Sequence, residues 1–193
     1  MSLISHLKLI SFDKAKNITI MENNSNIVML RNLLDEDTRR FTSAEVELEN
    51  SLKGWINEAR SMQLKTVLHR YLDFVQQHVK RLEGFFEEEK INAITLQNRV
   101  MLAFIDDTNE KLANCTQVEV KDACLLASIQ GINHFKISAY GTAAAFAKAL
   151  DLEKAAALFR ELEINEKHID DRLSQLAEYE INIKAVAPIA LQG

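Results

Sequence analysis

The stretch Leu152–Asn182, LEKAAALFRELEINEKHIDDRLSQLAEYEIN, is the clearest guide to the fold, because its apolar residues recur every three or four positions. The members of this stripe are Leu152, Ala155, Phe159, Leu162, Ile169, Leu173 and Leu176. Such spacing places apolar side chains along one face of a long amphipathic helix. We expect Asp151 to be the N-cap of this helix, and Pro188 lies just past its predicted end, where it cannot continue a helix.

Working outward from this stretch, the same periodicity predicts helical segments at about 26–61, 63–87, 91–113 and 117–149. The segment at 91–113 is shorter and less regular than the others, as expected of a helical crossover. Ferritin-like folds have this connectivity, in which a long connection joins two helical hairpins. We therefore predict an all-α, ferritin-like antiparallel four-helix bundle, with two helical hairpins joined by a crossover that contains a short fifth helix.

Length and composition predict a single folded domain. The chain has 193 residues, 47% of them hydrophobic, with five Gly and one Pro. This is enough for one core of ordinary size, and the scarcity of turn-forming residues favours long helices. We expect the bundle to span residues 26–183, with residues 1–25 as an N-terminal extension outside it and residues 184–193 as a C-terminal tail.

Charge and motif content exclude several classes of function. The chain has 23 Lys and Arg against 28 Asp and Glu, so its net charge is −5. The sequence contains no cluster of basic residues of the kind that binds the phosphate backbone of nucleic acid. No apolar run reaches transmembrane length, and we expect a cytoplasmic protein without a membrane partner. The sequence also lacks a Gly-rich phosphate loop and a nucleophile elbow, so hydrolase and nucleotide-binding functions have no support.

The two cysteines give no metal or catalytic signature. Cys115 and Cys124 are nine positions apart, without CxxC spacing and without a nearby His pair. We interpret them as ordinary thiols of a protein from a reducing compartment.

The informative residues are ionisable ones that interrupt the apolar stripes from within. They are Glu45, His78, Lys136, Glu166 and Asp170, each three, four or seven positions from apolar members of its stripe. Any one of them could reach the edge of the bundle with its polar end in water. Four of the predicted helices each place such a group near their midpoint. A polar cluster in the interior of the bundle is therefore as well supported as polar ends that reach water at its edge. Helical bundles build metal sites from inward carboxylates and histidines in this way.

Two stretches carry a resemblance to a known family. They are Ala123–Thr142, ACLLASIQGINHFKISAYGT, and Ala155–Leu173, AAALFRELEINEKHIDDRL. From about residue 27 to about 182 the chain resembles the YciE/YciF-type bacterial stress-protein family, a ferritin-like group. The resemblance implies a ferritin-like bundle, a homodimer, a link to stress responses and inward side chains suited to a two-metal centre. It brings no assigned reaction and no identified protein partner.

The resemblance also implies a ligand set. Carried over position by position, it assigns metal-ligating roles to Glu45, His78, Glu166 and Asp170. Two positions depart from the family pattern. The glutamate expected on the fourth segment is Lys136 in this chain, and the carboxylate expected one turn before His78 is Phe74.

These departures lead us to predict a vestigial centre. A di-iron site needs about four carboxylates and two imidazoles, and this chain offers three carboxylates and one imidazole. Lys136 also brings a positive charge to a place where a metal cation would lie. We expect Lys136 to be the internal counter-ion of a metal-free cluster in a structural or interaction protein that is not an enzyme.

Two alternatives remain open at this point. A single iron or manganese ion held by Glu45, His78, Glu166 and Asp170 would make the protein an oxidase or a peroxide-detoxifying protein. A plain helical binding module would instead expose an apolar stripe, for which the segment Val100–Ile105 is the candidate.

Overall fold

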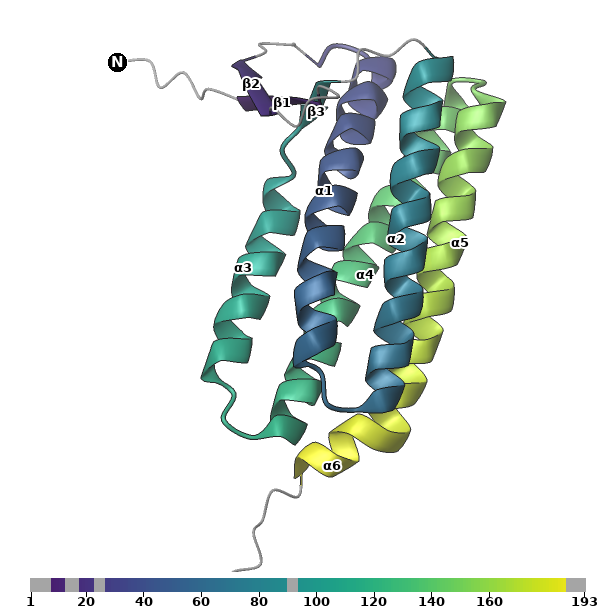
Figure 1. The fold of residues 1–193 in the computed structure, drawn as a ribbon. Coiled ribbons are helices and arrows are strands. Elements are labelled where there is room, and N and C mark those ends of the chain that lie inside the picture. Colours follow the sequence, from purple (N-terminus) through teal and green to yellow (C-terminus); the bar gives the residue numbers. More distant parts are fainter. Residues whose placement is uncertain (1–7, 13–17, 23–26, 90–93, 187–193) are drawn as a thin grey trace, which may run out of the picture.

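The computed structural model describes residues 8–12, 18–22, 27–89 and 94–186. Four long helices form its body (Figure 1). They are α1 (Leu30–Glu58), α2 (Met62–Glu88), α4 (Val118–Ala149) and α5 (Glu153–Leu176). Helices α1 and α2 form one antiparallel hairpin, and α4 and α5 form the other. The predicted bundle of two helical hairpins joined by a crossover is confirmed.

The crossover between the hairpins begins differently from the prediction. Helix α3 (Arg99–Asn114) starts eight residues later than the predicted segment 91–113, with the Asn98 side chain accepting a hydrogen bond from the Met101 N–H as its N-cap. Before it comes a short strand, β3 (Ile94–Leu96), which pairs with β1 (Lys8–Phe12).

These strands belong to a small antiparallel sheet that the helical periodicity did not predict. Strand β1 also pairs with β2 (Ile18–Glu22), so the strand order is β2-β1-β3. The sheet lies at the end of the bundle where α1 begins and α2 ends (Figure 1).

The prediction that Asp151 is an N-cap was wrong. The N-cap of α5 is Leu152, which makes no side-chain capping hydrogen bond to the described residues. Asp151 instead has a φ of 56°, and it closes α4. The Leu152 N–H bonds to the Ala147 carbonyl and the Asp151 N–H to the Lys148 carbonyl, which is the Schellman pattern of a helix C-terminus. Asp tolerates this left-handed conformation better than most residues.

Helix α5 continues into an irregular end. A single π-helical turn, η1 (Ala177–Ile181), is followed by the short helix α6 (Asn182–Val186). Together these elements extend slightly beyond the predicted end of the last helix at about residue 182.

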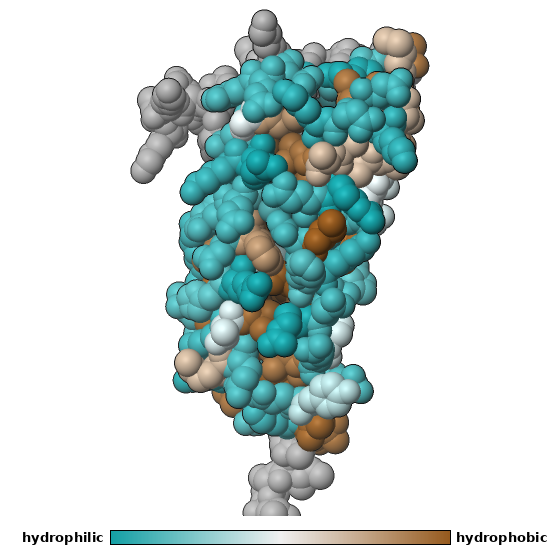
Figure 2. Space-filling view, turned by 90° about the vertical axis from the view of Figure 1, so that its right-hand side faces the viewer, coloured by the Kyte–Doolittle hydropathy of each residue, from teal (hydrophilic) through white to brown (hydrophobic). Residues whose placement is uncertain are grey.

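The apolar core falls into two parts that lie on either side of a polar layer. One part includes Leu48, Leu68, Val75, Ile132 and Ile169. The other includes Leu34, Phe41, Leu82, Tyr140 and Leu162. On each long helix the ionisable residue lies between members of the two parts, so helical periodicity itself places the charged groups at one level of the bundle. Hydrophilic residues cover most of the face in Figure 2, and hydrophobic ones show between them.

The apolar stripe proposed for a binding module is not exposed. Met101 and Ile105 are buried, and Phe104 packs against the core and against the Phe135 ring. Val100 and Ala103 are the members of that segment that are exposed to solvent. The stripe of α3 therefore serves to attach the crossover to the bundle.

Candidate functional site

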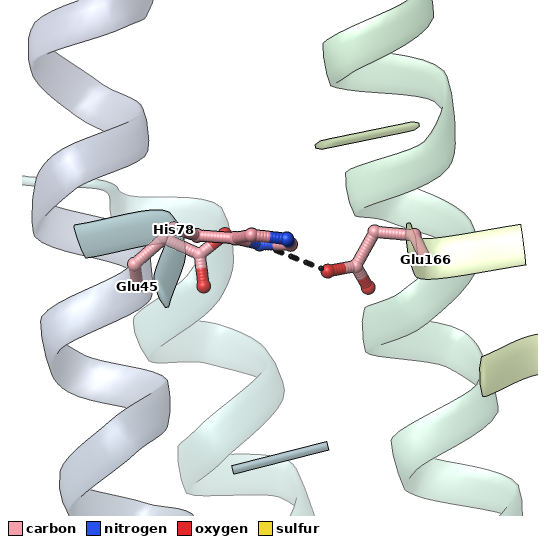
Figure 3. A group of neighbouring side chains, drawn as sticks. All are labelled: Glu45, His78 and Glu166. Atoms are coloured by element: carbon pink, nitrogen blue, oxygen red, sulfur yellow. Dashed lines mark hydrogen bonds and ion pairs between the residues drawn. The ribbon is translucent and has the colours of Figure 1, made fainter. Parts of the chain in front are cut away.

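One ionisable side chain from each long helix points into the middle of the bundle. These residues are Glu45 on α1, His78 on α2, Lys136 on α4 and Glu166 on α5, and none is more than 2% exposed. We call them the polar cluster. Figure 3 shows Glu45, His78 and Glu166 directed toward one another from three helices.

The Lys136 ammonium lies between the two carboxylates. Its Nζ is 2.9 Å from Oε2 of Glu45 and 2.6 Å from Oε1 of Glu166. The contact with Glu45 is a hydrogen bond as well as an ion pair, and the shorter contact with Glu166 is an ion pair. The ammonium also lies 4.9 Å from the centre of the Tyr71 ring. A single buried cation therefore bridges two anionic groups.

The His78 imidazole completes the cluster from α2, the hairpin partner of α1. Its Nδ1 is 3.3 Å from Oε1 of Glu45 and 3.4 Å from Oε1 of Glu166. Its Nε2 is 3.3 Å from the amide nitrogen of Asn165. With that amide donating, Nε2 accepts, and Nδ1 carries the proton that faces Glu45.

Three further polar side chains hold the carboxylates, and the sequence analysis did not assign them this role. The Tyr140 hydroxyl donates to Oε1 of Glu45. The Tyr71 hydroxyl and the Asn133 amide donate to Oε2 of Glu166, at 2.8 and 2.7 Å. Spacing could have found Asn133, because it lies on the α4 stripe three residues before Lys136.

The two carboxyl groups have different proton affinities. Burial favours the neutral form of Glu45, but the Lys136 charge and the contacts with His78 and Tyr140 outweigh it and lower its pKa to about 2. Burial raises the pKa of Glu166, and the Glu45 charge adds to this rise against the opposing Lys136. Glu45 is therefore the fixed anion of the cluster at neutral pH.

Lys136 is the fixed cation. Burial opposes its charge, but the neighbouring Glu166 and Glu45 carboxylates outweigh burial and raise the pKa of the ammonium. Lys136 therefore remains protonated at neutral pH despite its position in the core.

Asp170 does not join the polar cluster. It lies one turn beyond Glu166 on α5, and its Oδ1 is 2.8 Å from Nε2 of His134 on α4. His134 is 63% exposed at its side chain, so this pair lies toward the surface of the α4 and α5 hairpin. Of the four predicted ligands, the structure brings together Glu45, His78 and Glu166, whose candidate ligand atoms lie within 4.8 Å of one another.

The donor set does not fit a two-metal centre. Two carboxylates and one imidazole are fewer ligands than a pair of divalent ions requires. Phe74, at the position where the family resemblance implies a carboxylate, contributes a ring stacked 6.4 Å from the His78 imidazole instead. The space between the carboxylates contains the Lys136 ammonium, so even one metal ion would require this side chain to move.

Comparison with known proteins agrees with this architecture. The family model described as domain of unknown function DUF892 matches residues 29–186. Protein YciF of Escherichia coli strain K12 is 32% identical over 144 residues, which cover 74% of this chain and 87% of YciF. Among the described residues, no helix is both long enough and apolar enough to cross a membrane.

Solved structures give the same result for the fold. The crystal structure of the Escherichia coli stress protein YciF matches with a TM-score of 0.76 at 27% identity, covering 81% of this chain and 99% of that one. YcfI of Rhodopseudomonas palustris matches with a TM-score of 0.76 at 22% identity, covering 79% and 97%. A protein of Xanthomonas campestris matches with a TM-score of 0.64 at 16% identity, covering 82% and 95%. The last two similarities concern the fold alone.

Proposed function

The chain belongs to the family described as domain of unknown function DUF892, and from this membership we propose a stress-response protein with a structural or interaction role and no catalysis of its own. The description of the Escherichia coli relative as a stress protein supports the first part of the proposal. The contents of the polar cluster support the second part.

The observation that carries the proposal is the position of Lys136 between Glu45 and Glu166. Ferritin-like bundles hold metal ions between carboxylates and histidines of facing helices. In this chain an ammonium lies between the carboxylates, 2.9 Å from one and 2.6 Å from the other. We regard the cluster as a degenerate centre in which Lys136 neutralises the carboxylates in place of a metal ion.

Electrostatics favours this interpretation. Two unit charges 4 Å apart interact by about 4 kcal/mol at an effective dielectric constant of 20. A divalent cation beside the Lys136 ammonium would therefore be disfavoured by several kcal/mol. Loss of the Lys136 proton would remove this repulsion, but the raised pKa of the ammonium opposes that loss.

The alternative function is a metal-dependent oxidase or peroxide-detoxifying protein. Glu45, His78 and Glu166 present three ligand atoms within 4.8 Å, which could hold one iron or manganese ion. This alternative requires Lys136 to leave the cluster or to become neutral.

Metal analysis separates the two functions. Untagged protein would be incubated anaerobically with ferrous iron or manganese, desalted and submitted to elemental analysis, beside a Glu166→Ala variant. We expect far less than one metal ion per chain in both proteins. Near-stoichiometric metal that disappears in the Glu166→Ala variant would overturn the proposal and favour the oxidase.

The proposal also includes a homodimer, as the family resemblance implies, and a location in the cytoplasm. Light scattering of the eluting peak in size-exclusion chromatography would measure the mass of the assembly. We expect twice the 22.0 kDa of one chain. A mass of one chain at micromolar concentration would contradict the dimer.

A further inference from the structure

A second group of chemically reactive side chains lies outside the polar cluster, at the connection between α3 and α4. Cys115 is the C-cap residue of α3, and Cys124 lies near the start of α4. Residues 115–117 form the whole connection between the two helices. This turn is at the end of the molecule opposite to the small sheet (Figure 1).

The two thiols share one pocket. Cys115 and Cys124 line a cavity of about 320 Å³ together with Lys111, Thr116 and Val120. Both cysteines are partly exposed, and within the described chain neither belongs to a disulfide. A small molecule in the solvent can therefore reach either sulfur.

The sulfur atoms also interact with each other. Burial raises the pKa of the Cys124 thiol, and Cys115 is the next largest cause of that rise, through its charge and a hydrogen bond. Lys111 opposes the rise. A hydrogen bond from Cys115 acts on Cys124 only at short range, so the two thiols are neighbours within this pocket.

We propose that Cys115 and Cys124 form a reversible oxidation site, which closes into an intramolecular disulfide by exchange with a low-molecular-weight disulfide. The site is independent of the polar cluster and of the function proposed for it. Its distinguishing feature is the juxtaposition of two accessible thiols at one turn, which the nine-residue separation in the sequence did not indicate.

The exchange proceeds in two balanced steps. The thiolate of one cysteine attacks one sulfur of the small disulfide, which breaks its S–S bond, releases one small thiolate and leaves a mixed disulfide on that cysteine. The thiolate of the other cysteine then attacks the protein sulfur of the mixed disulfide and expels the second small thiolate. The two protein thiols lose two electrons, the small disulfide gains them, and the two thiol protons end on the two released small thiols.

The nucleophile in thiol exchange is the thiolate. Burial raises the pKa of the Cys124 thiol, so a mildly alkaline pH favours the reaction of this residue.

The test uses full-length protein incubated with oxidised and reduced glutathione at a series of ratios, acid-quenched and analysed by intact mass. We expect the wild type to lose both free thiols and two hydrogens, without a lasting glutathione adduct, and to regain both thiols with dithiothreitol. The matched variants are Cys115→Ser and Cys124→Ser, in which no second thiol can displace glutathione. Each should keep one adduct.

Several results would overturn the proposal. Wild-type protein that carries two glutathione adducts, stays fully reduced at every ratio, or forms disulfide-linked dimers would show that the two thiols do not pair within one chain. Circular dichroism of all samples would verify that the helices are intact during the exchange.

Discussion

The ammonium of Lys136 lies 2.6 Å from a carboxylate oxygen of Glu166, and the two residues face each other across the α4 and α5 hairpin with neither side chain more than 3% exposed. A charge at such depth is tolerated only when an opposite charge accompanies it. The stability of the bundle should therefore depend on the pairing of these charges.

Replacement of the cation alone should be strongly destabilising. In a Lys136→Met variant two buried carboxylates lose their shared partner, and breaking a buried ion pair in this way costs about 3–5 kcal/mol. Urea denaturation would measure the loss. The exposed Lys154 gives a matched control, because Lys154→Met should change stability by less than about 0.5 kcal/mol.

Removal of both partners should cost less than the sum of the single changes. A Lys136→Met/Glu166→Gln double variant replaces the cation and one anion together, so it leaves no uncompensated charge at that contact. We expect a favourable coupling of at least about 1 kcal/mol in the double-mutant cycle. Strict additivity would mean that the two charges do not depend on each other.

The two buried tyrosines should each contribute through a hydroxyl group. Tyr140→Phe removes the donor to Glu45, and Tyr71→Phe removes a donor to Glu166. Hydrogen bonds to charged groups contribute about 1.5–3 kcal/mol, and we expect losses of that size in denaturation experiments. Tyr179 is 72% exposed, so Tyr179→Phe should have little effect. Equal effects of all three changes would contradict a role of the buried hydroxyls.

Stability should fall in acid because of Glu45. Its pKa in the folded protein is about 2, below the ordinary value of 4.5, so between these values the unfolded chain binds more protons than the folded one. The stabilisation is therefore complete above about pH 4.5 and is lost as the pH falls toward 2, amounting to roughly 3 kcal/mol at about 1.4 kcal/mol per pKa unit.

A Glu45→Gln variant isolates this contribution. Glu166 has a raised pKa, so its contribution has the opposite sign and is lost as the pH rises, and burial, the largest cause of that rise, remains in the variant. We expect the difference in unfolding free energy between wild type and Glu45→Gln to shrink as the pH falls from 4.5 to 2. Parallel pH profiles of the two proteins would contradict the assignment.

Asp122 should stabilise the turn between α1 and α2. Its buried carboxylate on α4 accepts hydrogen bonds from the backbone N–H groups of Arg60 and Ser61, at 2.8 and 2.7 Å. Asp122→Ala leaves both donors without this partner, and we expect a loss of about 1.5–3 kcal/mol in thermal or urea unfolding. The exposed Asp171 provides the control, since Asp171→Ala should be nearly neutral.

Helical periodicity was sufficient to predict the bundle and the members of the polar cluster. Glu45, His78 and Glu166 lie on apolar stripes, and an angle around a helix axis is what spacing in the sequence determines. The same reasoning included Asp170, which the structure pairs with His134 near the surface. Spacing does not determine which neighbouring helix a side chain meets, and this choice depends on how the helices pack.

Other features depend on partners that are distant in the sequence. Strand β3 is three residues long, and it pairs with β1, which lies far from it near the start of the sequence, so no local period reveals it. The role of Tyr71 as a donor to Glu166 likewise depends on packing between α2 and α5, because the same residue fits an apolar stripe equally well.

The most direct test of the central claim is equilibrium dialysis of Mn²⁺ against the wild type and two Lys→Glu variants. Lys136→Glu replaces the internal cation by a potential ligand, whereas Lys154→Glu makes the same charge change at an exposed site. We expect no bound manganese in the wild type or in Lys154→Glu, and about one ion per chain in Lys136→Glu. Wild-type protein that binds manganese as well as Lys136→Glu does would contradict the claim that Lys136 takes the place of a metal ion.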